Sequence, residues 1–246
     1  MEVFKKSFRI EQSEVGPEGY ILLDSLQRRI QNISDEHGYL LGFGFDDMKK
    51  RGFFWVVSRL MVEIKQMPRL NDMLTIETFL TPPTGAGINR YYQLFNSEGL
   101  CLITGVAKWS VVSNETLKLV KTNQLDFVTN LQFSKEAIEF SNEGLKRIDF
   151  PSDQEVILKS LVVKQEDLDF NNHVNNTIYV KYIRDLFGIP SDLYAYQINF
   201  ISPLYLGDKV HIKAVSIENK IVFEATRELE DMNEEISFQA WFLKIS

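Results

Sequence analysis

The hydrophobic and polar positions of the first half predict one helix followed by a series of strands. Residues 20–38, YILLDSLQRRIQNISDEHG, place their apolar side chains on one helical face: Leu22, Leu26, Ile30 and Ile33. Gly38 is predicted to end this helix. Apolar, strand-like runs follow, separated by turns rich in Gly, Pro and Asn: residues 55–67, 73–80, 89–96 and 100–113.

The second half repeats this order. Residues 175–190 carry apolar side chains at the spacing of an amphipathic helix: Tyr179, Tyr182, Ile183, Leu186 and Phe187. Strand-like runs then follow at residues 194–202, 209–217, 221–229 and 236–245. We therefore predict an α+β fold of two similar repeats, each a long helix packed on a curled antiparallel sheet. The predicted boundaries are a first repeat at 1–125, a linker at 126–155 and a second repeat at 156–246.

Composition indicates a globular protein with a sizeable core. Hydrophobic residues make up 44% of the 246 residues, and aromatic residues 12%. The net charge of −7 argues against a nucleic-acid binding protein, because binding phosphates needs a basic surface. The single cysteine, Cys101, excludes an internal disulfide and fits a reducing compartment. Since no signal peptide and no long apolar run is apparent, we expect a cytoplasmic protein without a membrane span.

The stretch DLDFNNHVNNT at 167–177 concentrates the candidate chemistry. Asp169, Asn171 and His173 stand two apart, directly before the second predicted helix. An imidazole can relay a proton near neutral pH, an amide can fix a water or a carbonyl, and a carboxylate can hold both in place. Two other interpretations stay open: a loop in which Asn and Asp serve only as turn and cap residues, and a metal site formed by Asp167, Asp169 and His173.

The start of the second helix adds a possible anion site. Backbone N–H groups near Val174 to Asn176 are predicted to lack intrahelical partners and to carry the positive end of the helix dipole. A carbonyl oxygen that develops negative charge would be stabilised there. Asn175 or Asn176 is predicted to cap the helix.

DLDFNNHVNN at a helix start and the W-x-x-S-R strand at 55–59, within a duplicated helix-and-sheet unit, resemble the acyl-ACP thioesterases of fatty acid synthesis. The resemblance covers nearly the whole chain and implies a tandem double hot-dog fold. It implies hydrolysis of the thioester of fatty acyl-acyl carrier protein with release of free fatty acid, and catalytic roles for Asp169, Asn171 and His173. It implies no metal or organic cofactor, and an acyl carrier protein as the partner of a monomer or homodimer.

The same resemblance implies substrate contacts in both repeats. Val174 and Asn175 are expected to bind substrate at the helix start. Trp55 and Arg59 are expected near the acyl pocket, because the first hot-dog repeat houses the acyl chain in this family. They lie four apart in one predicted strand and would therefore share a face of the sheet. The alternative is ordinary core packing, with the arginine head reaching toward solvent.

One position departs from the family pattern. Members commonly have a glutamate where the segment NFISPLYLGD carries Pro203. Proline cannot accept or relay a proton. Either another group supplies that function, with Glu166 and Asp167 as the candidates nearby in sequence, or the reaction runs without it, or the activity is impaired or altered. Two other functions therefore stay open: an acyl-CoA thioesterase, and a non-catalytic protein that binds acyl chains or acyl carriers.

Overall fold

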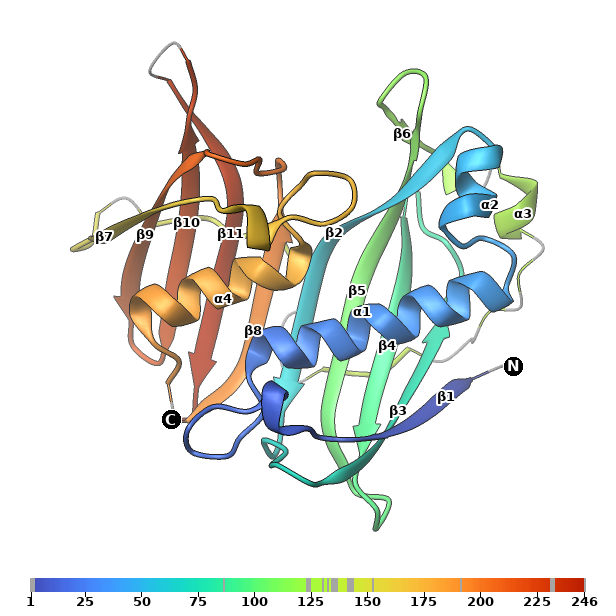
Figure 1. Cartoon of the computed structure of the whole chain (residues 1–246), viewed down its shortest axis with the longest axis horizontal. Helices are drawn as coiled ribbons and strands as arrows, with labels where there is room; N and C mark the ends of the chain where they lie inside the picture. The colour runs from blue at the N-terminus through green and yellow to red at the C-terminus, as the bar shows by residue number, and fades with distance from the viewer. Residues whose placement is uncertain are drawn as a thin grey trace. The chain divides into compact units, whose positions relative to one another are not determined.

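The computed structural model describes residues 3–85, 87–122, 125–129, 131, 133, 137–140, 144–151, 153–190, 192–230 and 233–245. The chain divides into two compact units, Met1–Leu145 and Lys146–Ser246. Each unit is an antiparallel sheet with one long helix packed along it, which confirms the predicted α+β repeat (Figure 1). The predicted linker at 126–155 lies partly outside the described residues.

The N-terminal unit has the strand order β1-β3-β4-β5-β2, with β6 paired to β5. Its elements are β1 (Phe4–Arg9), the 3-10 helix η1 (Gln12–Glu14), α1 (Leu23–Leu40), α2 (Phe45–Lys50), β2 (Phe53–Ile64), β3 (Met73–Leu80), β4 (Gly87–Phe95), β5 (Cys101–Ser113), β6 (Leu119–Val120) and α3 (Asp126–Thr129). Helix α1 buries Leu26, Ile30 and Ile33 of the apolar face predicted for it, whereas Leu22 precedes the helix as its N-cap. Gly38 does not end the helix, because the Leu41 N–H still donates to the His37 carbonyl one turn earlier (3.0 Å).

Helix α1 meets its sheet partly through polar side chains. Arg90 of β4 is 3% exposed, and its Nη1 donates a hydrogen bond to Nδ1 of His37 on α1 (2.9 Å). Beside this pair, the Ser34 and Tyr92 hydroxyls share a hydrogen bond of 2.8 Å. A guanidinium can only donate, so the His37 ring accepts and is neutral. Burial, together with the Arg90 charge, lowers the pKa of His37 to about 4.

The C-terminal unit has the strand order β8-β11-β10-β9-β7. Its elements are β7 (Ile157–Val162), the 3-10 helix η3 (Gln165–Asp167), α4 (Asn176–Phe187), β8 (Leu193–Phe200), β9 (Lys209–Ile217), β10 (Lys220–Glu228) and β11 (Glu234–Lys244). Aromatic rings fill the contact between helix and sheet: Tyr179 and Phe187 from α4, and Phe200, Phe223 and Phe238 from the strands.

The two units share the order end strand, 3-10 turn, long helix and four strands, and the N-terminal unit adds α2, β6 and α3. The end strands β1 and β7 each pair with the second strand after the long helix, β3 and β9 respectively. Phe4 at the start of β1 corresponds to Ile157 of β7, and Gln12 of η1 corresponds to Gln165 of η3 at the same spacing. Each unit therefore runs from an end strand through a 3-10 turn and a loop into its long helix, which places the predicted catalytic loop directly before α4.

Candidate active site

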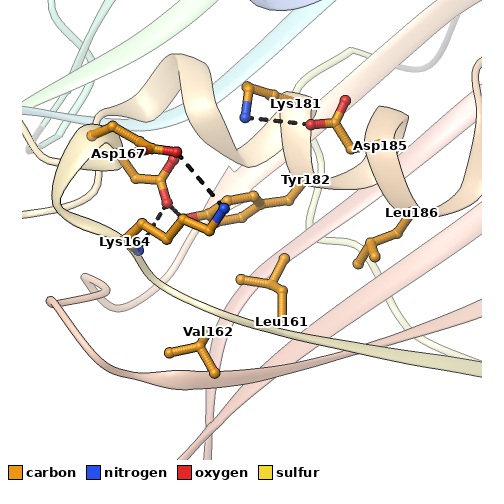
Figure 2. A pocket seen from close by; sticks show the side chains of 9 residues that line it. Leu161, Val162, Lys164, Asp167, Lys181, Tyr182, Asp185 and Leu186 are labelled. Carbon is orange, nitrogen blue, oxygen red and sulfur yellow. Dashed lines mark hydrogen bonds and ion pairs between the residues drawn. The ribbon is translucent and has the colours of Figure 1, made fainter.

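A buried carboxylate anchors the loop between β7 and α4. Asp167 is 4% exposed, and its Oδ2 accepts hydrogen bonds from the Lys164 N–H (3.0 Å) and from the Tyr182 hydroxyl of α4 (2.9 Å), as Figure 2 shows. Burial and the adjacent Asp167 carboxylate raise the pKa of Tyr182, so its hydroxyl stays protonated as a donor. Asp167, one of the two carboxylates considered in place of the family glutamate, is therefore engaged in fastening the loop to α4.

A pocket of about 150 Å³ lies beside this anchor, between β7 and α4 (Figure 2). Leu161 and Leu186 line it together with the charged side chains of Lys181 and Asp185. The Lys181 Nζ lies 3.3 Å from the Asp185 Oδ2. Glu166, the other carboxylate considered, also lines this pocket. The side chains predicted to be catalytic are not among its lining residues.

The catalytic candidates occupy a tight turn that follows this anchor. The Asp169 N–H donates to the His173 carbonyl (2.7 Å), and Asn172 takes the left-handed turn position with φ 60°. Asp169 Oδ1 accepts hydrogen bonds from the backbone N–H groups of Asn171 (2.8 Å) and His173 (3.2 Å). The Asp169 carboxylate thus fixes the backbone on which the exposed Asn171 and half-buried His173 side chains are mounted.

A residue that the sequence did not single out contacts the candidate histidine. The Tyr205 ring meets the His173 ring edge to face, with 5.0 Å between ring centroids and 87° between planes. The Tyr205 N–H donates to Asp208 Oδ2 (2.9 Å), and the Arg227 guanidinium lies 5.3 Å from the Tyr205 ring centre. Pro203, two residues earlier, is exposed. The sequence feature that could have indicated Tyr205 is an aromatic residue between Pro203 and Gly207, in a turn.

The backbone at the start of α4 differs from the expectation. The Val174 N–H donates to the Leu204 carbonyl (2.9 Å), and the Asn175 N–H donates to the Asp167 carbonyl (2.9 Å). These two N–H groups, expected to be free for a substrate oxygen, are therefore engaged, because the folded-back loop supplies acceptors for both. Asn175 instead caps the helix, its Oδ1 accepting from the Thr177 N–H (2.9 Å). Within the described part of the chain, the Asn176 N–H has no acceptor.

The prediction that Trp55 and Arg59 share a face of β2 is wrong. Trp55 pairs with Val111 of β5, whereas Arg59 pairs with Lys108, and the register shifts at Ser58 between them. Val111 and Lys108 are three apart in a regularly paired strand, so they point to opposite faces. The extra residue in β2 is a β-bulge, and it reverses the alternation that the spacing implied.

Each of these two side chains makes contacts within the N-terminal unit. Trp55 packs edge to face on Phe43 (5.7 Å between centroids), and its Nε1–H donates to the Phe43 carbonyl (3.2 Å). It is partly buried and packs against a cluster of buried residues on the helix-covered face that includes Met48. The Arg59 Nη1 donates to the Leu145 carbonyl (2.8 Å). These contacts agree with the packing interpretation, and the pairing of the two residues at one substrate site has no support in this geometry.

The described ranges hold neither a cluster of metal ligands nor a membrane-spanning helix. His, Cys, Asp and Glu side chains there form no group of three that could hold a metal ion. None of the helices described is long and apolar enough to cross a membrane.

Comparison with known proteins covers both units. The family model for the acyl-ACP thioesterase N-terminal domain matches residues 1–128, and the model for the acyl-ACP thioesterase C-terminal domain matches residues 151–240. A palmitoyl-acyl carrier protein thioesterase of Gossypium hirsutum is 27% identical over 198 residues, 76% of this chain and 48% of its own length. An oleoyl-acyl carrier protein thioesterase of Arabidopsis thaliana is 26% identical over 205 residues, 77% of this chain and 56% of its own. The chain thus spans about half the length of the curated relatives it matches.

Solved structures with the same fold cover nearly the whole chain. An acyl-ACP thioesterase from Bacteroides thetaiotaomicron superposes with a TM-score of 0.85 at 21% identity, over 98% of this chain and 97% of its own. A 12:0-ACP thioesterase from Umbellularia californica gives 0.82 at 18% identity, over 98% and 96%. These likenesses confirm the predicted hot-dog type of fold. With both family models matched along its length, the chain belongs to the acyl-ACP thioesterase family.

Proposed function

We propose that this protein hydrolyses the thioester of fatty acyl-acyl carrier protein and releases free fatty acid. The observation that carries the proposal is the turn before α4, in which the Asp169 carboxylate holds the backbone that presents Asn171 and His173. The relatives, which are palmitoyl- and oleoyl-acyl carrier protein thioesterases, supply the substrate class. We place the reaction in the cytoplasm, in fatty acid biosynthesis, with an acyl carrier protein as partner.

In this mechanism His173 and Asn171 act on the attacking water and the thioester carbonyl. The His173 imidazole accepts a proton as the water oxygen bonds to the carbonyl carbon, and it returns that proton to the thiolate that leaves when the carbon–sulfur bond breaks. The Asn171 amide orients the water or the carbonyl. Asp169 is the positioning residue, because it holds the turn and not the substrate.

The tetrahedral oxyanion needs donors other than those first expected. Because the Val174 and Asn175 N–H groups already have acceptors, we assign the oxyanion to the Asn176 N–H and the positive end of α4. Val174 is 3% exposed and its backbone ties the loop to Leu204, while Asn175 caps the helix. Both residues then support the site without touching substrate.

No carboxylate takes the place of the family glutamate in this proposal. Pro203 is exposed, and Asp167 is occupied by Tyr182. Tyr205 instead packs on His173, which fixes the plane of the imidazole. The water is therefore activated by His173 alone, with Tyr205 as a positioning residue.

The acyl chain is assigned to the N-terminal repeat, 1–125, on the face of its sheet that α1 and α2 cover. Trp55 packs against the apolar cluster on that face and would form part of the pocket wall. Arg59, on the opposite face, would act only by holding the Leu145 carbonyl.

Thiol release from matched palmitoyl-acyl carrier protein and palmitoyl-CoA tests the proposal. The purified protein is expected to release thiol faster from the carrier protein. Faster release from the CoA ester would support the acyl-CoA alternative and contradict the substrate assignment. Tight binding of acyl carrier without thiol release would favour the non-catalytic alternative, for which the proline at 203 is the supporting feature.

A further inference from the structure

Strand β7 ends the sheet of the C-terminal unit and leaves apolar side chains in solvent. Within the described strands it pairs with β9 alone, and it lies at the end of the strand order. Ile157, Leu158 and Val162 are 55%, 57% and 53% exposed. An exposed apolar edge strand is a template for pairing with another strand.

The backbone of β7 offers its unpaired groups at alternate residues. Val163, directly after the strand, donates to and accepts from the backbone of 207–208 (3.0 and 3.1 Å), so its N–H and C=O face the β9 side. Successive residues of a strand face opposite neighbours. The N–H and C=O groups of Leu158, Ser160 and Val162 therefore point away from β9, along the open edge.

The corresponding strand of the N-terminal unit carries charges at the same positions. Lys5 and Arg9 of β1 stand where β7 has Leu158 and Val162, and a serine lies between them in both strands. Charged side chains, lysine above all, are a usual means of keeping sheet edges from pairing. The chain thus protects one of two equivalent edges with cations and leaves the other apolar.

The one charged residue of β7 does not protect the edge in the same way. Lys159 turns toward α4, where its Nζ donates to the Leu186 carbonyl (2.5 Å) and lies 5.2 Å from the Phe187 ring centre. The ammonium group of Lys159 therefore lies at the C-terminal end of α4, on the face of the sheet opposite to Leu158 and Val162.

We propose that β7 is a homodimer interface, in which β7 of a second copy of this chain pairs antiparallel about a two-fold axis at Ser160. Leu158 of each copy then lies opposite Val162 of the other, and the outward backbone groups of both strands become paired. The apolar side chains of the two copies form one cluster on the face away from α4. The strand is its own complement, so a second copy is the partner that fits it.

Strand geometry selects this register. Residues opposite each other in an antiparallel pair point to the same face, so two identical strands related by a two-fold axis must place one residue opposite itself. An axis at Lys159 would set two lysines opposite each other, which is unfavourable. An axis at Ser160 sets two small hydroxyl side chains there and keeps both lysines apart.

Sedimentation velocity over a concentration series tests the interface. The wild-type chain is expected to shift from monomer to dimer as its concentration rises. The double substitution Leu158→Lys, Val162→Arg, which copies β1, is expected to weaken the dimer by a factor of about ten or more. The control Leu117→Lys, at a hairpin residue 74% exposed, should dimerise as the wild type does. A wild-type chain that stays monomeric throughout, or a double variant that dimerises equally well, overturns the proposal.

Cross-linking tests the register. Opposed residues of a hydrogen-bonded antiparallel pair have Cα atoms about 5.5 Å apart, within disulfide range. In a Cys101→Ser background, Ser160→Cys is expected to give a covalent dimer on mild oxidation, and Lys159→Cys is not. Covalent dimer from Lys159→Cys but not from Ser160→Cys overturns the assignment of the axis. Unchanged thermal unfolding of each variant shows that it has folded, since these side chains are exposed.

Discussion

The loops that lead into α1 and α4 have the same backbone and different side chains. In the N-terminal unit the Gly16 N–H donates to the Tyr20 carbonyl (2.9 Å), as the Asp169 N–H donates to the His173 carbonyl (2.7 Å) in the C-terminal unit. Both loops continue from a 3-10 turn of the same length. The turn geometry is therefore a property of the duplicated fold.

Equivalent bonds also fix the two loops to their helices. The Leu22 N–H donates to the Glu14 carbonyl (2.8 Å), and the Asn175 N–H donates to the Asp167 carbonyl (2.9 Å). The carboxylate at the end of the 3-10 turn has a partner on the helix in both units, Arg29 for the half-buried Glu14 and Tyr182 for the buried Asp167. The fold thus builds the same support twice.

What differs is the set of side chains mounted on this support. The N-terminal loop has Gly16, Glu18 and Tyr20 at the positions of Asp169, Asn171 and His173. A turn that forms without Asp, Asn and His does not require them for folding. The comparison therefore argues against the interpretation of 167–177 as a loop whose polar residues serve only as turns and caps, and it provides matched controls.

Asn171→Ala is expected to have the largest effect in this comparison. Loss of one group that positions water or carbonyl lowers kcat by roughly 10²–10³. Thiol release from acyl carrier protein measures it, with Glu18→Ala, the equivalent change in the N-terminal loop, as the control. Similar losses in both variants would mean that the two loops do not differ in function.

Asp169→Gly gives the C-terminal turn the residue that the N-terminal turn has at the equivalent position, Gly16. The turn should still form, since the N-terminal unit forms it with glycine, but the backbone bonds to Asn171 and His173 are lost. We expect kcat to fall by roughly 10–100-fold, with little change in the thermal unfolding midpoint. A large drop in that midpoint would show that Asp169 serves stability, contrary to its assigned role.

Tyr182→Phe probes the support and not the chemistry. It removes the hydroxyl that donates to the buried Asp167 carboxylate (2.9 Å), and we expect a loss of about 2 to 3 kcal/mol in the free energy of unfolding. Urea titration measures it. Unchanged stability would contradict the anchoring role of Asp167.

The two units also differ in the side chains between helix and sheet, which are partly polar in the N-terminal unit and aromatic in the C-terminal unit. The folded chain holds His37 neutral, with its pKa near 4 against 6.5 for the free group. Below pH 6.5 the unfolded chain binds a proton that the folded chain excludes, so this stability is complete above pH 6.5 and is lost as pH falls toward 4. We expect a loss of roughly 2 kcal/mol between pH 7 and pH 4.5.

Urea unfolding in an Asp35→Asn background isolates this effect. Partial desolvation raises the pKa of Asp35 to about 6, so this carboxyl titrates with the opposite sign. Its contribution is the smaller because much of the residue remains in solvent. Adding His37→Gln should reduce the stability lost between pH 7 and pH 4.5 by roughly 2 kcal/mol. If the dependence persists, His37 is not its source.

Local patterns in the sequence predicted the helices, the duplicated order and the polar loop. The amphipathic spacing of α1 and α4 and the turn residues before α4 are local signals, and both were confirmed. The end strands β1 and β7 were missed, because FKKSFR and ILKSLV are short and do not alternate cleanly.

The errors came from contacts between residues distant in sequence. The bulge at Ser58 depends on pairing with β5, so the spacing of Trp55 and Arg59 could not reveal it. The acceptor of the Val174 N–H is Leu204, thirty residues later, and no pattern near the helix start predicts it. The approach of Tyr205 to His173 has the same origin.

The most direct test of the account compares His173→Ala with Tyr20→Ala, the same truncation in the two equivalent turns. Thiol release from acyl carrier protein substrates should collapse in His173→Ala, by roughly 10²-fold or more, and stay close to wild type in Tyr20→Ala. Equal rates in the wild type and His173→Ala, or an equal loss in both variants, would contradict the claim that the chemistry belongs to the C-terminal loop alone.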